Sequence, residues 1–139
     1  MTSVLITGAS RGIGRAGALA LDRAGRDVIA GVRDAEAGRR LAAEASGRLR
    51  TVHLDVTDPD SIHAAAQAAG DRLDALVNNA GIAVGGVVEA LDLGELRRQL
   101  DINVVGQVAV NQALLPALRA ASGRVVFISS CPVECRRRS

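Results

Sequence analysis

A glycine-rich segment lies near the start of the chain, with the sequence Thr7-Gly8-Ala9-Ser10-Arg11-Gly12-Ile13-Gly14. It follows the apolar run 4–6 and precedes a helical pattern. Glycines at this spacing let the backbone approach a pyrophosphate, and the amides at the tip of the next helix point a partial positive charge at it. The segment therefore predicts a nucleotide-binding α/β protein. The alternative is a tight strand-to-helix turn that holds no ligand.

Strand-like and helix-like periods alternate along the whole chain. We expect strands at 3–7, 28–32, 49–55, 73–78 and 125–129. Helices are expected at 12–24, 35–45, 57–70 and 91–121, with a loop at 81–86. Pro116 is expected to kink the last helix or to start its final part. This order predicts an α/β fold, a Rossmann-like doubly wound parallel sheet of about five strands.

Composition narrows the class of protein. A chain of 139 residues with 48% hydrophobic residues fits one domain with a real core. Its net charge of +2 comes from arginines interspersed with acids, apart from 136–138, so no nucleic-acid partner is expected. No leader precedes the first apolar run and no run is long enough to cross a bilayer, so we expect a cytoplasmic protein without a membrane partner. Cys131 and Cys135 lack a second ligand pair, and no metal site is expected.

Two residue types are absent from the sequence. The chain contains no tyrosine and no lysine, and all 17 of its basic residues are arginine. A mechanism that needs a phenol or an amine from this chain is therefore excluded. The predicted phosphate site is unaffected, because backbone amides hold the anion.

Five motifs carry a resemblance to a known family. Together with the glycine-rich segment, Leu54-Asp55-Val56, Asn78-Asn79-Ala80-Gly81, Asn103 and Ile128-Ser129-Ser130 resemble the short-chain dehydrogenase/reductase family. The resemblance runs from Met1 to about Ser130, with the motifs in the family's order. They fall on expected strand ends or helices, and the carboxyl ends of strands are where open α/β sheets bind ligands.

The resemblance implies a set of cofactor-binding residues. The turn residues Gly8, Ser10, Arg11, Gly12, Ile13 and Gly14 would hold the pyrophosphate of a nicotinamide dinucleotide. Asp55 and Val56 would flank the adenine, and Asn79, Ala80 and Gly81 would lie along a ribose, while Asn78 braces the sheet. Alternatively, Asp55 is a turn or cap acid and the paired asparagines form a purely structural turn.

The end of the second strand bears on the choice of cofactor. In NAD-binding folds an acid stands there and accepts hydrogen bonds from the ribose hydroxyls. This chain has Val32 at that place, and Arg33 and Arg11 could face a 2′-phosphate with forked donors. We therefore predict NADP, with NAD as the alternative because Asp34 follows. Both arginines could also be ordinary solvated side chains.

The resemblance also implies hydride transfer between the nicotinamide and a carbonyl or alcohol. The family uses a tyrosine, a lysine, a serine that polarises the carbonyl and an asparagine that anchors a water relay. Asn103 and Ser130 match the last two, as the expected catalytic residues. The tyrosine and lysine would fall beyond Ser139. Alternatively, Asn103 is a helix residue satisfied by backbone and Ser130 belongs to a strand-end turn.

The resemblance stops after Ser130, where the chain reads Cys131-Pro132-Val133-Glu134-Cys135-Arg136-Arg137-Arg138-Ser139. We expect an incomplete dinucleotide-binding domain at 1–130, with the later strands and helices missing, and a divergent tail at 131–139. A truncated or frame-shifted gene product is one interpretation, and a genuine arginine-rich tail is the other. An uncovered fifth strand would favour self-association, with the helix around 91–121 as the contact surface for a homo-oligomer.

Three functions remain open at this stage. The first is an NADP-dependent oxidoreductase that acts on a small carbonyl or alcohol in a full-length form, the present chain being catalytically incomplete. The second is a dinucleotide-binding module without turnover. The third is an inert or partner-binding remnant.

Overall fold

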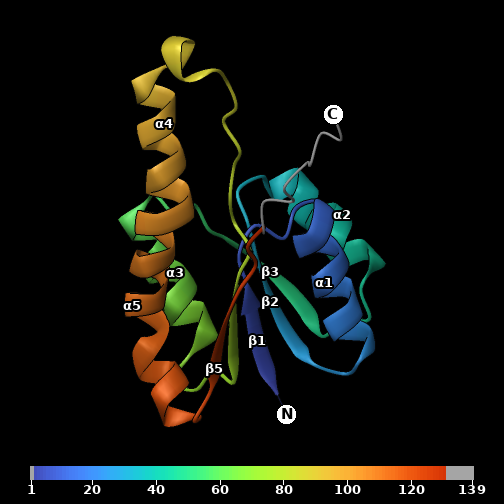
Figure 1. The fold of residues 1–139 in the computed structure, drawn as a ribbon. Helices are drawn as coiled ribbons and strands as arrows, with labels where there is room; N and C mark the ends of the chain where they lie inside the picture. The colour runs from blue at the N-terminus through green and yellow to red at the C-terminus, as the bar shows by residue number, and fades with distance from the viewer. Residues whose placement is uncertain (1, 131–139) are drawn as a thin grey trace, which may run out of the picture.

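The computed structural model describes residues 2–130, which form a five-stranded, entirely parallel sheet. The strands lie in the order β3-β2-β1-β4-β5 (Figure 1). Their bounds are β1 (Ser3–Ile6), β2 (Asp27–Val32), β3 (Leu49–His53), β4 (Ala75–Asn78) and β5 (Arg124–Phe127). The predicted α/β class and the parallel five-stranded sheet are confirmed.

Helices cover both faces of the sheet (Figure 1). The helices α1 (Gly12–Arg23) and α2 (Ala35–Glu44) pack on one face, and α3 (Pro59–Ala69), α4 (Leu93–Leu100) and α5 (Gly106–Ala120) lie on the other. A 3₁₀ turn, η1 (Val88–Ala90), precedes α4, and a π turn, η2 (Asp101–Val105), joins α4 to α5. The column of α4 and α5 extends beyond the carboxyl ends of the strands, so it forms one wall above the sheet edge.

The central strand β1 fixes the register of the sheet. Leu5 lies opposite Ile29 on β2 and Leu76 on β4, and all three side chains are buried. One apolar core fills the space between the sheet and α3 and α5, and a second lies beneath α1 and α2. Burial on both faces is what a parallel sheet requires.

The long helix expected at 91–121 is interrupted. The α-helical hydrogen-bond pattern gives way to a π turn at Asp101–Val105 and resumes at Gly106. Pro116 does not start a new helix, because α5 continues through it to Ala120. The buried side chains of Leu114 and Leu118 flank the proline and hold this part of the helix against the core.

β3 and β4 are each two residues shorter than expected, and a polar side chain lies next to the shortened end of each strand. β4 begins at Ala75, and the side chain of the preceding Asp74 accepts a hydrogen bond from the Ser3 backbone N–H at 2.8 Å. β3 ends at His53, and Asp55 belongs to the turn that follows. Polar side chains adjacent to a strand compete for backbone groups in this way.

The two edges of the sheet differ in polarity. On β3, Arg50, Thr51 and His53 are exposed, which is the usual protection of a free edge. On β5 every residue from Arg124 to Phe127 is exposed, and the side chain of Phe127 is 57% accessible. Within residues 2–130, β5 therefore presents apolar side chains and an edge without a strand partner. Among residues 2–130, no helix combines the length and the apolar character that crossing a membrane would demand.

Candidate functional site

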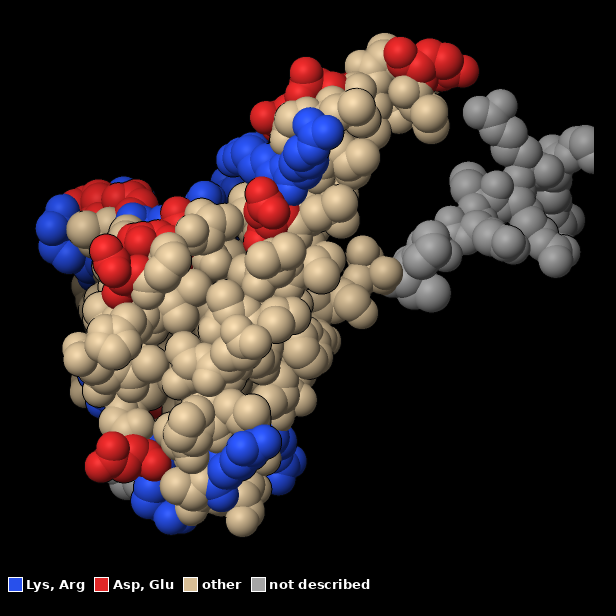
Figure 2. Space-filling view, turned by 90° about the vertical axis from the view of Figure 1, so that its left-hand side faces the viewer, with Lys and Arg blue, Asp and Glu red and all other residues tan. Residues whose placement is uncertain are grey.

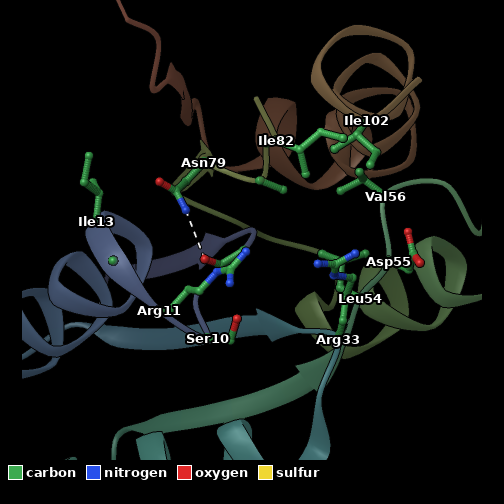
Figure 3. Close-up of a pocket in the computed structure, with 14 residues that line it drawn as sticks. Ser10, Arg11, Ile13, Arg33, Leu54, Asp55, Val56, Asn79, Ile82 and Ile102 are labelled. Atoms are coloured by element: carbon green, nitrogen blue, oxygen red, sulfur yellow. Dashed lines mark hydrogen bonds between the residues drawn. The ribbon is translucent and has the colours of Figure 1, made fainter. Parts of the chain in front are cut away.

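The strand order reverses between β1 and β4, and a cavity of about 280 Å³ opens there at the carboxyl edge of the sheet (Figure 3). This switch point is where open α/β sheets bind ligands. The structure brings together, around this cavity, the expected cofactor-binding residues Gly8, Ser10, Arg11, Gly12, Ile13, Arg33, Asp55, Val56, Asn79, Ala80 and Gly81. Gly14 is buried behind the turn and does not line it.

Two of the turn glycines are required by packing within the protein. Gly8 has φ +65°, and a Cβ there would lie 2.8 Å from the Ala80 Cα. A Cβ on Gly14 would lie 2.3 Å from both the Gly8 carbonyl oxygen and the Asn79 Nδ2. These two glycines therefore let the turn seat against the end of β4.

Gly12 has a different role. Its φ is +56°, so it adopts the left-handed conformation, but a Cβ there would meet no protein atom within 4 Å. The space in front of Gly12 is part of the cavity. Here the missing side chain leaves room for a ligand to reach the backbone.

The helix that starts at Gly12 has an open N-terminus. Arg11 precedes it in extended conformation and makes no capping hydrogen bond with its side chain, and the first turn of the helix contains no acidic residue. The first amides of a helix have no intrahelical partners and carry a partial positive charge. With Gly12 and Ile13 on the cavity wall, this helix end is suited to an external anion.

Thr7 and Asn79 fix the turn to the end of β4. The buried Thr7 Oγ1 accepts hydrogen bonds from the backbone N–H groups of Asn79 and Ala80, at 3.0 and 2.9 Å. The Asn79 side-chain amide donates to the carbonyl oxygens of Thr7 and Gly8, both at 3.1 Å. Thr7 was not among the expected site residues, although it stands directly before Gly8 in the glycine-rich segment. Asn79 therefore braces the turn while also lining the cavity.

Two arginines face the same space. Figure 3 shows the side chains of Arg11, from the glycine-rich turn, and Arg33, from the end of β2, extending toward the cavity. The neighbouring acid Asp34 is occupied elsewhere, because its Oδ1 accepts the Glu36 N–H at 2.9 Å and caps α2. Of the two charged residues that follow β2, the cationic Arg33 therefore lines the cavity and the anionic Asp34 does not.

Asp55 forms a turn at the cavity wall. Its Oδ1 accepts hydrogen bonds from the Thr57 backbone N–H at 2.9 Å and from the Thr57 hydroxyl at 2.7 Å. The hydrogen bond from the Thr57 backbone N–H lowers the pKa of Asp55 most. Burial opposes this effect, and the Thr57 hydroxyl and the positive charge of Arg33 lower the pKa further. Asp55 is therefore a carboxylate at neutral pH. Leu54, Ile82 and Ile102 complete the apolar lining. Leu54 belongs to one of the expected motifs, whereas Ile82 and Ile102 were not among the expected cofactor-binding residues.

The expected catalytic residues do not line this cavity. Asn103 lies in the π turn, where its side chain accepts the Ile82 N–H at 2.9 Å and donates to the Ile82 carbonyl at 2.8 Å. Ser130 is exposed and lies beyond the end of β5.

Asn78 is fully buried in the sheet. It contacts Asn111 on α5 at 3.4 Å, and its Oδ1 has no partner within the described part of the chain. The Cys131 and Cys135 positions fall outside the described residues. Over residues 2–130, no three potential ligand side chains cluster as a metal site would require.

Known proteins resemble this chain along nearly its whole length. Residues 2–135 match the family described as short chain dehydrogenase. The chain is 41% identical over 138 residues to trans-4-hydroxycyclohexanecarboxylate dehydrogenase of Sinomonas cyclohexanicum, covering 91% of this chain and 53% of that protein. It is 42% identical over 135 residues to human retinol dehydrogenase 5, and this match covers 91% of the chain and 42% of the human protein.

A solved structure agrees with these sequence matches. A short-chain dehydrogenase from Streptomyces avermitilis superposes with a TM-score of 0.85 at 40% identity, over 93% of this chain and 49% of the other. The chain thus spans about half the length of the relatives it matches.

Proposed function

The chain belongs to the short-chain dehydrogenase family, and from that premise we propose that its glycine-rich cleft binds NADP(H) in preference to NAD(H). The observation that carries this proposal is the uncapped start of α1 facing a cavity that two arginines, Arg11 and Arg33, also line. The helix end suits a pyrophosphate, and a pair of guanidinium groups suits an additional phosphate.

The fit of the dinucleotide rests on this chain's own groups. Gly12 leaves the backbone accessible, and the amides of the first α1 turn would hold the pyrophosphate. Asp55 and Val56 stand at the opposite wall, where the adenine would lie, and Asn79 holds the floor rigid. Asp34 caps α2 and does not line the cavity, so its carboxylate does not take the place of the acid that binds the ribose hydroxyls in NAD-binding folds.

A titration tests the choice of cofactor. We expect the fluorescence of NADPH to change on binding, with an affinity at least tenfold higher than that of NADH. Arg33→Gln should remove most of this preference, because it deletes a charge that only NADPH uses. Arg119→Gln, on the exposed end of α5, serves as the control. Equal affinities for NADPH and NADH in the original chain would overturn the assignment of NADP.

For catalysis we propose an oxidoreductase lineage acting on a small alcohol or carbonyl. A bound nicotinamide supplies or accepts a hydride in this family. Among the relatives, two are named dehydrogenases of retinol and of trans-4-hydroxycyclohexanecarboxylate, which supports the alcohol class. Ser130 would polarise the carbonyl, and its place beyond β5 puts it at the carboxyl edge of the sheet.

Asn103 acts as a positioning residue in this proposal. Both polar ends of its side chain are bound by the backbone of Ile82, which lines the cavity. It therefore holds the wall of the cleft. Asn103→Leu should weaken NADPH binding and lower stability together, whereas Ser130→Ala should change neither. An Asn103→Leu variant with unchanged affinity would contradict this role.

The polypeptide of 139 residues is proposed to bind without turnover. It contains no tyrosine and no lysine, so the family's proton-transfer groups would have to come from elsewhere. The purified chain should bind NADPH and show no oxidation of simple alcohols. Measurable turnover would overturn this point, and absence of binding would favour the alternative of an inert or partner-binding remnant.

We also propose that copies of the chain associate through α4, η2 and α5. Exposed apolar side chains recur along this column at helical spacing, namely Leu100, Val104, Val108 and Leu115. Figure 2 shows that the middle of this side of the molecule is broadly uncharged, whereas charged side chains lie over its upper part, where α4 is, and at its lower end. Light scattering after size-exclusion chromatography should show dimers or larger species, and Val108→Glu should shift them toward monomer. A monodisperse, cooperatively melting monomer would refute the proposal.

A further inference from the structure

A second cavity adjoins the dinucleotide cleft. Its volume is about 770 Å³, and it lies between the start of α3 and the column of α4 and η2. The two cavities share Arg33, Asp55, Val56 and Ile102 as a common wall. The dinucleotide proposed above accounts for the first cavity and leaves the second without a role.

The inner wall of the second cavity is apolar. Ile62 from α3 faces Ile102, Val105 and Ala109 from the η2–α5 segment. Val105 is 59% accessible although it lines a concave surface. Accessible apolar surface in a cavity favours a ligand with an apolar body, because its burial releases water from both surfaces.

The rim of the cavity is cationic. Arg33 from the end of β2 and Arg97 from α4 line it, and neither forms an ion pair within residues 2–130. Arg98 also lines the rim and contacts Glu95 at 3.4 Å. Two carboxylates, Asp55 and Asp101, also line the cavity, so its three arginines still give it an excess of positive charge.

We propose that this cavity binds an amphipathic organic anion. Its apolar body lies on Ile62, Ile102 and Val105, and its anionic head lies between Arg33 and Arg97. Charge-assisted hydrogen bonds from two guanidinium groups hold the head, and the apolar wall selects against small inorganic anions.

Sharing of Arg33 couples the two cavities. A guanidinium engaged by the anion in the second cavity is less available to a 2′-phosphate in the first. This coupling, and only this part, rests on the proposed NADP function. The anion should therefore weaken NADPH binding more than NADH binding, and NADPH should weaken anion binding by the same factor.

Octyl phosphate, used below its micelle-forming concentration, tests the site by calorimetric titration of the full chain without dinucleotide. We expect saturable binding at one molecule per chain. Octyl glucoside has the same apolar body without charge, and inorganic phosphate has the charge without the body; each should bind at least tenfold more weakly. Decanoate in place of octyl phosphate shows whether the head can be a carboxylate. Equal binding of octyl phosphate and octyl glucoside would overturn the proposal.

Two matched pairs of variants locate the site. Arg97→Gln should weaken octyl phosphate binding about tenfold, as expected for the loss of one charge-assisted contact, whereas Arg119→Gln should not. Val105→Gln should weaken it about threefold, and Val88→Gln, at the exposed η1 turn, should leave it unchanged. All four side chains are exposed, so we expect the variants to fold, and circular dichroism verifies this. Because Arg97 and Val105 lie on the proposed association surface, light scattering verifies that the association state is the same in all variants. Unchanged binding in both Arg97→Gln and Val105→Gln would overturn the assignment.

The dinucleotide titrations separate the two proposals. If octyl phosphate binds with the expected variant pattern and NADPH does not bind, the second cavity stands and the proposed function fails. If NADPH binds and octyl phosphate does not, the further inference fails alone.

Discussion

The N-termini of α1 and of α2 to α4 are constructed in opposite ways. Asp34, Asp58 and Asp92 cap α2, α3 and α4, and each helix has another acid in its first turn. At α1 the cap position holds Arg11, whose side chain makes no capping bond, and no acid follows. The chain thus neutralises three helix ends with its own carboxylates and leaves one open beside a cavity.

The difference has an energetic meaning. A capping side chain stabilises a helix by about 1 kcal/mol, so an uncapped end costs stability in the free protein. An external anion that binds there restores the missing interaction. The helix end that faces the ligand cavity is thus distinguished from the others by the absence of a capping acid. Four experiments test this difference between the helix ends and the roles of the residues around the cavity.

The largest effect is expected for Gly14→Ala. The new Cβ would lie 2.3 Å from the Gly8 carbonyl oxygen, a backbone atom, so the turn must move. We expect a loss of about 3 kcal/mol in the free energy of unfolding and loss of NADPH binding. Urea denaturation followed by circular dichroism measures the first, and fluorescence titration the second.

Gly12→Ala is the matched control for Gly14→Ala. Its Cβ meets no protein atom within 4 Å, so only the left-handed conformation is strained, at about 1 kcal/mol. NADPH affinity should still fall, because the methyl group enters the cavity. Equal loss of stability in the two variants would contradict the distinction between packing and ligand-facing glycines.

The second largest effect is expected when the N-terminus of α1 receives a capping acid like those of α2, α3 and α4. Arg11→Asp places a capping carboxylate where the ligand's phosphate would lie and removes a guanidinium. The free protein should gain up to about 1 kcal/mol of stability, whereas NADPH affinity should fall about 100-fold. Thermal melting with and without NADPH shows both. A variant that binds NADPH as tightly as the original chain would refute the open-end interpretation.

The third effect is the reverse experiment on α3. Asp58→Ala removes a cap whose carboxylate accepts the Asp60 N–H at 3.1 Å. Stability should fall by about 1 kcal/mol with NADPH affinity unchanged. Denaturant titration and the same fluorescence assay are the measurements, and a drop in affinity matching that of Arg11→Asp would remove the contrast between the helix ends.

The smallest effect concerns the pH dependence contributed by Asp55. Its pKa in the folded chain is lowered, chiefly by the Thr57 backbone N–H, so the native state favours the carboxylate. The contribution to stability is present above the pKa of the unfolded state, about 3.9, and is lost as pH falls through the folded value. The stability difference between the original chain and Asp55→Asn should therefore be larger at pH 6 than at pH 3. A difference that grows on acidification would contradict the sign.

Much of the fold could be predicted because local patterns and tertiary structure agree. The buried strands correspond to apolar runs in the sequence. Asp58 and Pro59 indicate the start of a helix, and α3 begins at Pro59. The cluster of residues around the cleft also follows from topology, since parallel strand ends meet at one edge. Whether those residues bind NADP stays a prediction.

Other features depend on contacts between distant residues. The π turn in the expected continuous helix accompanies the bonds between Asn103 and Ile82 and the close approach of Gly106, where a Cβ would lie 2.7 Å from Val56. No local pattern encodes these contacts. The second cavity likewise combines α3 with α4, which are far apart in sequence. The partners of Thr7 are also distant, because its hydroxyl bonds to residues that follow β4, the strand beside β1.

The π turn also determines which side of α4 lies above a given side of α5. A π turn contains one residue more than an α turn, so the surface before it is rotated by about 100° from the surface of an uninterrupted helix. Deleting one residue within 101–105 would swing Arg97 and Arg98 around the helix axis while α5 stays anchored on the core. Insertions and deletions of a single residue at this joint offer evolution a route to reshape the rim without disturbing the hydrophobic interior.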